Sequence, residues 1–150
     1  MLVVVVTGLI ALSATPKAAE PHLCDQLTAS ALDIERVANA VSFKDIDGAL
    51  AVDACEAAVD AFPEVTRFQY QLGRALARTD KHVEAQVWHL KAARGAHAAA
   101  QYSYGLGYAL GRGVPQSSRN AVRWWRKAAE QQLANAQFNL ANMYEQGEGV

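Results

Sequence analysis

Cysteine, methionine and proline are scarce in this chain, which has two, two and four of them among 150 residues. Two cysteines are too few for a disulfide-dense scaffold, and they form neither a C-x-x-C pair nor a cluster with histidine at metal-ligand spacing. The chain also lacks the patterns S-x-x-K, G-x-S-x-G, H-E-x-x-H and G-x-G-x-x-G. We therefore predict no catalytic set, no metal site and no bound cofactor.

An excess of charge of one sign is also missing. The 14 Lys and Arg residues nearly balance the 15 Asp and Glu residues, so the formal net charge is -1. This balance argues against a nucleic-acid partner and against polybasic attachment to a membrane. Residues 20–67 hold ten acidic and three basic residues, whereas residues 68–150 hold five acidic and ten basic ones. We interpret these as solvated faces of opposite sign, with a charged docking site as the alternative.

One uninterrupted apolar run stands at the start of the chain. Residues 1–14, MLVVVVTGLIALSA, have the length of a signal-peptide core and are shorter than the roughly 20 residues that span a bilayer. Ala11 and Ser13 supply small residues for cleavage. We predict a signal peptide over residues 1–19, export to the bacterial periplasm or the extracellular space, and no stable membrane anchor after cleavage. A buried N-terminal helix is the alternative.

Export gives the two cysteines a structural role. In an oxidising compartment Cys24 and Cys55 are most simply one disulfide, which would stabilise the fold by roughly 3–4 kcal/mol in the chain-entropy model. Residues 46–62 show helical spacing, with Leu50 and Cys55 on the inward stripe. Residues 20–66 are then a helical cap tethered by the disulfide. Two unpaired thiols in a cytosolic protein remain the alternative.

The rest of the chain is organised by an internal repeat. Residues 85–114 and 121–150 are identical at twelve of thirty positions, at an offset of 36 residues. Such a period is typical of helical repeat arrays. A first, shorter unit begins at Arg67. The segment that joins its first helix to the next helix is four residues shorter than the corresponding segment of the later unit. Gly73 and Gly105 stand where two helices are expected to approach closely.

Local signals predict helix ends and one packing contact. Thr79 or Asp80 is expected to cap the helix that follows it, and Ser117 to cap the corresponding helix of the next unit. His89 stands at the repeat position of Trp125. We expect it to pack with its polar edge outward.

The repeated residues resemble the Sel1-like repeat, whose units read A-x-x-W-Y-x-K-A-A and then A-x-A-Q-x-x-L-G-x-x-Y-x-x-G-x-G-V. The matching positions here are Ala121, Trp124, Trp125, Lys127, Ala128, Ala129, Ala134, Ala136, Gln137, Leu140, Ala141, Tyr144, Gly147, Gly149 and Val150. The resemblance covers about half of the chain. It implies an all-α, right-handed α-solenoid of helix-turn-helix units, related to tetratricopeptide repeats, over residues 67–150 with an incomplete last unit.

The resemblance also implies where a partner would bind. In repeats of this kind the first helix of each unit lines the concave side, and here each unit places an aromatic residue there: Tyr70, Tyr102 and Phe138. Rigid aromatic side chains make contact area at low entropic cost. The neighbouring groove residues are Arg67, Arg74, Arg78, Leu106, Asn135 and Asn142. Alternatively, the aromatics only stiffen the groove.

We therefore expect a protein-interaction adaptor that binds a protein or peptide partner through its concave face and is not an enzyme. One alternative is a hydrolase like the β-lactamase-like, cysteine-containing Sel1-like proteins, although those carry a cysteine pair in every repeat. Another is a capping or regulatory module of a larger envelope protein. The chain ends at Val150, inside a joint, which favours a truncated sequence or a last helix packed on another surface.

Overall fold

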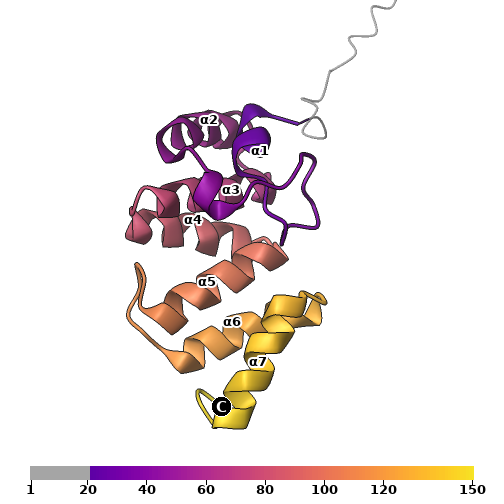
Figure 1. Cartoon of the computed structure of the whole chain (residues 1–150), viewed down its shortest axis with the longest axis vertical. Helices are drawn as coiled ribbons and strands as arrows, with labels where there is room; N and C mark the ends of the chain where they lie inside the picture. Colours follow the sequence, from indigo (N-terminus) through magenta and orange to yellow (C-terminus); the bar gives the residue numbers. More distant parts are fainter. Residues whose placement is uncertain (1–20) are drawn as a thin grey trace, which may run out of the picture.

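The computed structural model describes residues 21–150, and the predicted signal peptide lies outside the described residues. Every regular element in this range is helical, and each long helix packs against the next one in the sequence (Figure 1). The all-α solenoid is thereby confirmed. The elements are α1 (Leu23–Thr28), η1 (Phe43–Asp45), α2 (Gly48–Ala61), α3 (Thr66–Arg78), α4 (His82–Arg94), α5 (Ala98–Leu110), α6 (Ser118–Glu130) and α7 (Ala134–Gln146).

Three of the joints between helices are tight turns of the same type. The middle residues Asp80, Ala96 and Gln132 have φ values of 61°, 63° and 63°. The residue after each one donates its N–H to the carbonyl five positions back, as in Lys81 N to Leu76 O at 3.1 Å. Asp80 thus ends α3, and the prediction that Thr79 or Asp80 caps α4 is wrong.

The joint between α5 and α6 is longer, as the repeat offset predicted. It runs over residues 111–117, against 79–81 between α3 and α4. Gly111 ends α5 with a φ of 66°, a left-handed conformation that glycine adopts without strain. Ser117 accepts a hydrogen bond from Asn120 N at 3.2 Å, which confirms it as the cap of α6.

The N-terminal part is fastened to the first long helix by the predicted disulfide. Cys24 of α1 and Cys55 of α2 are bonded, and both are fully buried. The small residues Ala51 and Ala58 face the core with Cys55, so that α2 approaches α3 closely. Leu50 is half exposed, and its expected inward position is wrong because these alanines occupy that face.

One glycine of α3 and one of α5 each contact an aromatic ring of the following helix. A Cβ atom on Gly105 would lie 2.7 Å from the Trp125 ring, and one on Gly73 would lie 2.3 Å from the His89 ring. Real Cβ atoms do not approach this closely, so any side chain there would separate the helices. The predicted close approach is therefore made by a ring of one helix seated on a glycine of the other.

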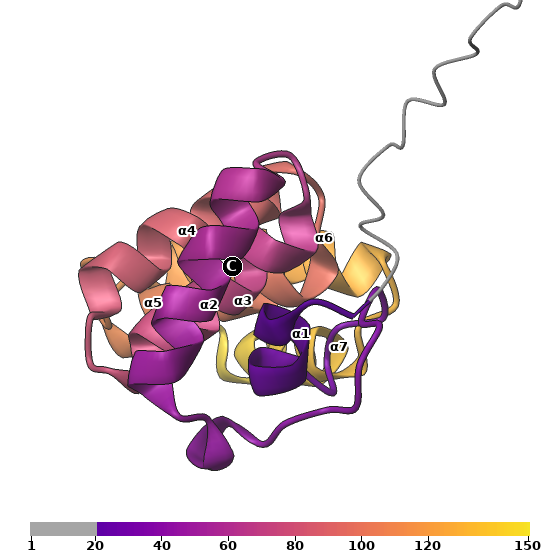
Figure 2. The ribbon, with the colours of Figure 1, turned by 90° about the horizontal axis from the view of Figure 1, so that it is seen from above.

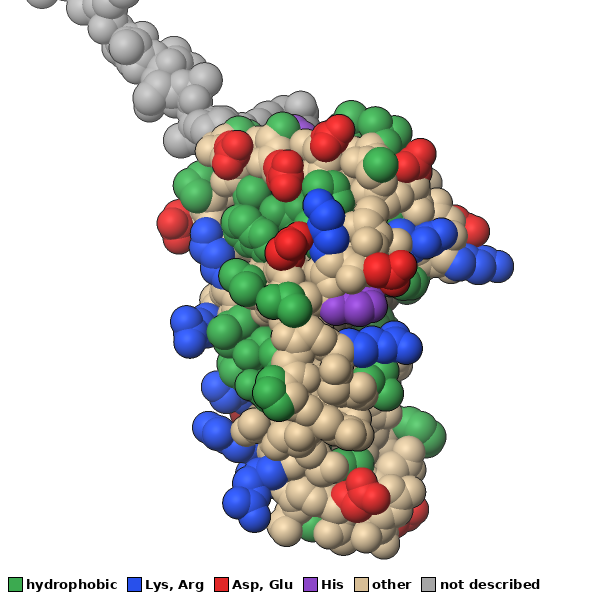
Figure 3. Space-filling model, turned by 90° about the vertical axis from the view of Figure 1, so that its left-hand side faces the viewer, with side chains coloured by type: hydrophobic (Ala, Val, Ile, Leu, Met, Phe, Trp, Pro, Cys, Tyr) green, Lys and Arg blue, Asp and Glu red, His purple; other side chains and the backbone are tan. Residues whose placement is uncertain are grey.

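The surface charges separate along the solenoid. Figure 3 shows acidic side chains gathered at the N-terminal end and Lys and Arg side chains along one edge of the repeat region. None of the helices of residues 21–150 is both long and apolar enough to cross a bilayer.

Candidate functional site

The first part of the concave side is occupied by the protein itself. Residues 29–42, which we call the cap loop, leave α1 and run to η1. Figure 2 shows α1 and the cap loop on the same side of the molecule as α7. Leu32 of this loop packs against a buried cluster that includes Tyr70 and Ala100. The cap loop therefore covers the wall that α3 and α5 would present to a partner.

A buried ion pair holds α1 on α3. Arg67 Nε donates to Asp25 Oδ1 at 2.7 Å and Arg67 Nη2 to Asp25 Oδ2 at 3.3 Å. Gln71 Nε2 adds a bond to Asp25 Oδ1 at 2.9 Å. Arg67 was predicted to line an open groove. That expectation is wrong because its guanidinium lies beneath α1.

Arg74 closes the two ends of the cap loop. Its Nη1 donates to Thr28 O and its Nη2 to Val41 O at 3.1 Å. Val41 N donates to Ala29 O at 2.7 Å, which joins the same two ends directly. Burial lowers the pKa of the Arg74 guanidinium, while Tyr70 and Asp33 raise it. Arg74 thus acts first as a clamp on the chain's own backbone.

Tyr70 is also covered. Only 1% of it is exposed, its ring lies 4.8 Å from the His97 ring, and burial raises the pKa of its hydroxyl. The positive charge of Arg74 opposes this rise in pKa. Tyr70 therefore packs the interior and does not face a partner, contrary to the expectation from the repeat.

A second buried polar contact joins the cap loop to α5. His97 Nδ1 accepts from Ala100 N at 3.3 Å, so in the neutral ring the proton is on Nε2. Nε2 lies 3.2 Å from Asp33 Oδ1, and the side chains of both residues are 1% exposed. The contact satisfies the distance for an ion pair but not the geometry of a hydrogen bond. Sequence reasoning missed Asp25 and Asp33, because no local pattern distinguishes them from other acidic residues.

Beside the cap loop the concave side keeps an open hollow of about 510 Å³. It lies between the end of α3, the start of α4 and the face of α5 that carries Tyr102, Leu106 and Leu110. We call it the concave pocket. Its lining residues are Ser30, Leu32, Phe43, Tyr70, Arg74, Ala77, Arg78, Asp80, His82, Gln86, His89, Tyr102, Ser103, Leu106, Gly107, Leu110 and Arg112.

Several of the predicted groove residues do meet at this pocket. Tyr102 and Leu106 are half buried there, and Arg78 is exposed at its edge. The three predicted residues of α7 lie apart from it, because none of them lines the pocket. Phe138 is 67% exposed, Asn135 is exposed and Asn142 is half buried.

The inner wall of the pocket carries polar groups without partners. Gln86 Oε1 and both ring nitrogens of His89 are buried and form no hydrogen bond. Burial, together with the charges of Arg74 and His97, lowers the pKa of His89 to about 3. The expectation that the polar edge of His89 faces outward is wrong, since the ring lies against Gly73.

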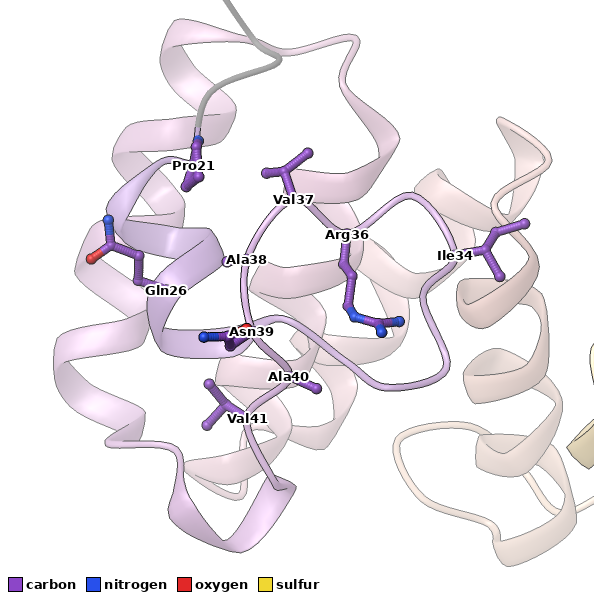
Figure 4. Close-up of a pocket in the computed structure, with 9 residues that line it drawn as sticks. All are labelled: Pro21, Gln26, Ile34, Arg36, Val37, Ala38, Asn39, Ala40 and Val41. Atoms are coloured by element: carbon purple, nitrogen blue, oxygen red, sulfur yellow. The ribbon is translucent and has the colours of Figure 1, made fainter.

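A second hollow lies within the cap loop. It measures about 880 Å³ and is bordered by Pro21, Gln26, Ile34 and residues 36–41. Figure 4 shows that the loop encircles it and that Ile34 points away from the ring of chain. Arg36 is its one charged lining residue, and its Nη1 donates to Asp33 O at 3.2 Å. Its lining holds one charged side chain and no aromatic one, so this hollow is a weaker candidate than the concave pocket.

Within residues 21–150 no group of three His, Cys, Asp or Glu side chains is placed to hold a metal ion. The concave pocket combines aromatic and aliphatic surface with arginine side chains. Such a surface recognises a ligand by shape and charge.

An array of helix pairs with a concave recognition surface defines the class of α-solenoid repeat proteins. A family model of the Sel1 repeat matches residues 98–133 and 134–150, which are α5 with α6 and then α7. With this match and the solved structures below, the chain is a Sel1-repeat protein. Sel1 repeats generally mediate protein–protein interactions, and their helical solenoids are typically non-catalytic.

Two solved structures share this fold. One is a protective antigen of uropathogenic Escherichia coli strains displaying an SLR fold, with 32% identity, a TM-score of 0.62, and 68% of this chain and 22% of that chain covered. The other is a Sel1 repeat protein from Oxalobacter formigenes, with 29% identity, a TM-score of 0.61, and 68% and 30% covered. The chain therefore spans less than a third of the length of either. No curated protein matches it.

Proposed function

We propose that this chain is an exported interaction adaptor that binds a segment of a partner protein on its concave side. The observation that carries this proposal is the surface left open beside the cap loop. Tyr102 and Leu106 stay accessible at the concave pocket, and Phe138 lies exposed on the next concave helix. Because the cap loop fills the first unit, the binding surface is shifted toward α5 and α7.

Two features of this chain and one similar protein support export. The disulfide between Cys24 and Cys55 is a bond that persists in oxidising compartments and is rare in the cytosol. The apolar run of residues 1–14 has the length of a signal-peptide core. The similar Escherichia coli protein is described as a protective antigen, which also fits a protein presented outside the cytoplasm.

Site-specific photo-crosslinking in the producing cells tests this proposal. A photoreactive phenylalanine analogue replaces Tyr102, Leu106 or Phe138 in turn. We expect these positions to form covalent adducts with one shared protein, identified by mass spectrometry. The matched controls are Val83 and Val87 of α4, which are 67% and 62% exposed but do not line the concave pocket.

The controls decide between faces of the molecule. Adducts that form from Val83 and Val87 and not from the concave positions would move the binding surface elsewhere. Adducts at none of the five positions would contradict the adaptor role.

A further inference from the structure

Building on the proposed function, we infer that the concave pocket binds an acidic segment of the partner, with its carboxylates on Arg78 and Arg112 and an apolar side chain on Tyr102 and Leu106. The proposal names the chemistry of the partner and rests on three features of the pocket. These are its charge, its apolar wall and its unsatisfied acceptor.

The charged groups of the pocket are mostly positive. Arg74, Arg78 and Arg112 line it, and Asp80 is its one acidic lining residue. The Asp80 side chain is 95% exposed and lies 3.7 Å from His82 Nε2. In the described part of the chain neither Arg78 nor Arg112 forms an ion pair with a carboxylate. Arginine presents a planar fork that matches a carboxylate, so these two side chains are suited to an anionic ligand.

A side chain of the cap loop already packs against the apolar wall of the pocket. Tyr102, Leu106 and Leu110 stand at helical spacing on one face of α5, and all three line the pocket. Leu32 of the cap loop enters the same pocket from the other side. The next residue, Asp33, lies outside the pocket, with its carboxylate 3.2 Å from His97 Nε2. An apolar side chain of a loop is thus already accommodated on this wall.

Gln86 supplies the third feature. Its amide lies against Gly107, where a Cβ atom would be 2.7 Å from Gln86 Oε1. Gln86 is 8% exposed, lines the pocket, and its Oε1 accepts no hydrogen bond. A buried acceptor without a donor is costly, and the N–H of a bound peptide would satisfy it. A peptide ligand therefore offers what this wall lacks.

Fluorescence anisotropy with the purified, disulfide-bonded chain tests the inference. The probes are three labelled peptide pools of equal length and equal leucine content, which carry glutamate, glutamine or lysine at the remaining positions. We expect the glutamate pool to bind best and to weaken as salt rises. Arg78→Ala and Arg112→Ala should each weaken it by roughly two- to fivefold, the range of an exposed ion pair.

Arg123→Ala is the matched control, because it removes the same charge from an exposed position of α6 outside the pocket. It should bind the glutamate pool like the unaltered chain. Equal binding of the glutamate and glutamine pools, with both pocket variants unchanged, would overturn the acidic ligand while leaving a concave binding site in place. Binding of no pool, together with absent crosslinks at Tyr102 and Leu106, would overturn the proposed function as well.

Discussion

His89 and Trp125 occupy the same place in successive repeats, each with its ring over a glycine of the preceding helix. Trp125 satisfies its one polar group, since Nε1 donates to Tyr102 O at 3.1 Å. His89 leaves both ring nitrogens without partners. The indole of Trp125 therefore fits this position with its N–H paired. The imidazole of His89 has no partner there, and it stays neutral because a buried positive charge is unfavourable.

This difference predicts a dependence of stability on pH. Burial lowers the pKa of His89 from its ordinary 6.5 to about 3 in the folded chain. Between these values the unfolded chain binds a proton that the folded chain does not, so the free energy of unfolding falls as the pH falls, by at most about 1.4 kcal/mol per pH unit. We expect His89→Phe to remove this part of the slope in urea unfolding measured from neutral to mildly acidic pH.

His82→Phe provides the control, because its imidazole is partly exposed. It should leave the slope as it is in the unaltered chain. A slope that is the same with His89→Phe as without it would show that the buried imidazole is not the titrating group.

At the scale of elements, α1 depends on tertiary contacts. It has six residues, and an isolated helix of that length is not stable in water. The disulfide, the Asp25–Arg67 pair and the Arg74 clamp each fix a different point of α1 and the cap loop. The disulfide ties α1 to α2, and Arg67 and Arg74 tie α1 and the cap loop to α3, so these contacts also set how much of the concave side is open.

The disulfide variant Cys24→Ser with Cys55→Ser tests this dependence. Removal of a cross-link spanning 31 residues should lower the free energy of unfolding by roughly 3–4 kcal/mol in the chain-entropy model. Amide hydrogen exchange should rise in α1 and in the cap loop while α5 changes little. Reducing agent added to the unaltered chain should have the same effect, and added to the variant it should have none. Unchanged exchange in α1 would show that the polar contacts alone hold it.

Helix ends follow local rules only in part. Ser117 and Gly111 mark their helix ends as their residue types predict. Asp80, Ala96 and Gln132 do not, because three side chains of different chemistry adopt the same left-handed conformation. Their turn is imposed by the packing of the helices on either side, and single-residue preferences are too weak to signal it.

At the scale of the whole molecule, the number of packing partners falls along the solenoid. α3 packs against α1, α2 and α4, whereas α7 packs against α6. All of α3 from Arg67 to Leu76 is buried, but in α7 only Ala136 and Leu140 are. In a repeat array local stability follows the contacts with neighbours.

Native-state hydrogen exchange should therefore show a gradient. We expect the slowest exchange in α3, intermediate rates in α5 and the fastest in α7. The comparison of α5 with α7 is an internal control, because both are concave helices of thirteen residues. Protection of α7 equal to that of α3 would contradict the gradient and would indicate that another surface covers α7.

The sequence by itself determined the helix pairs and the offset of 36 residues, and it favoured the pairing of Cys24 with Cys55 over two free thiols. Each of these depends on signals that are local, periodic or unique, such as twelve shared positions or the presence of two cysteines only. The groove aromatics were predictable as repeat positions for the same reason.

Which of those positions a partner can reach was decided by the tertiary structure alone. Arg67 meets Asp25 across 42 positions of the chain, and Arg74 meets Thr28 across 46. A contact between such distant residues produces no periodic pattern and no motif in the sequence. Each of the residues is of a type that is equally common on an exposed surface. Only the folded chain shows that the cap loop occupies the first unit and leaves the concave pocket beside it.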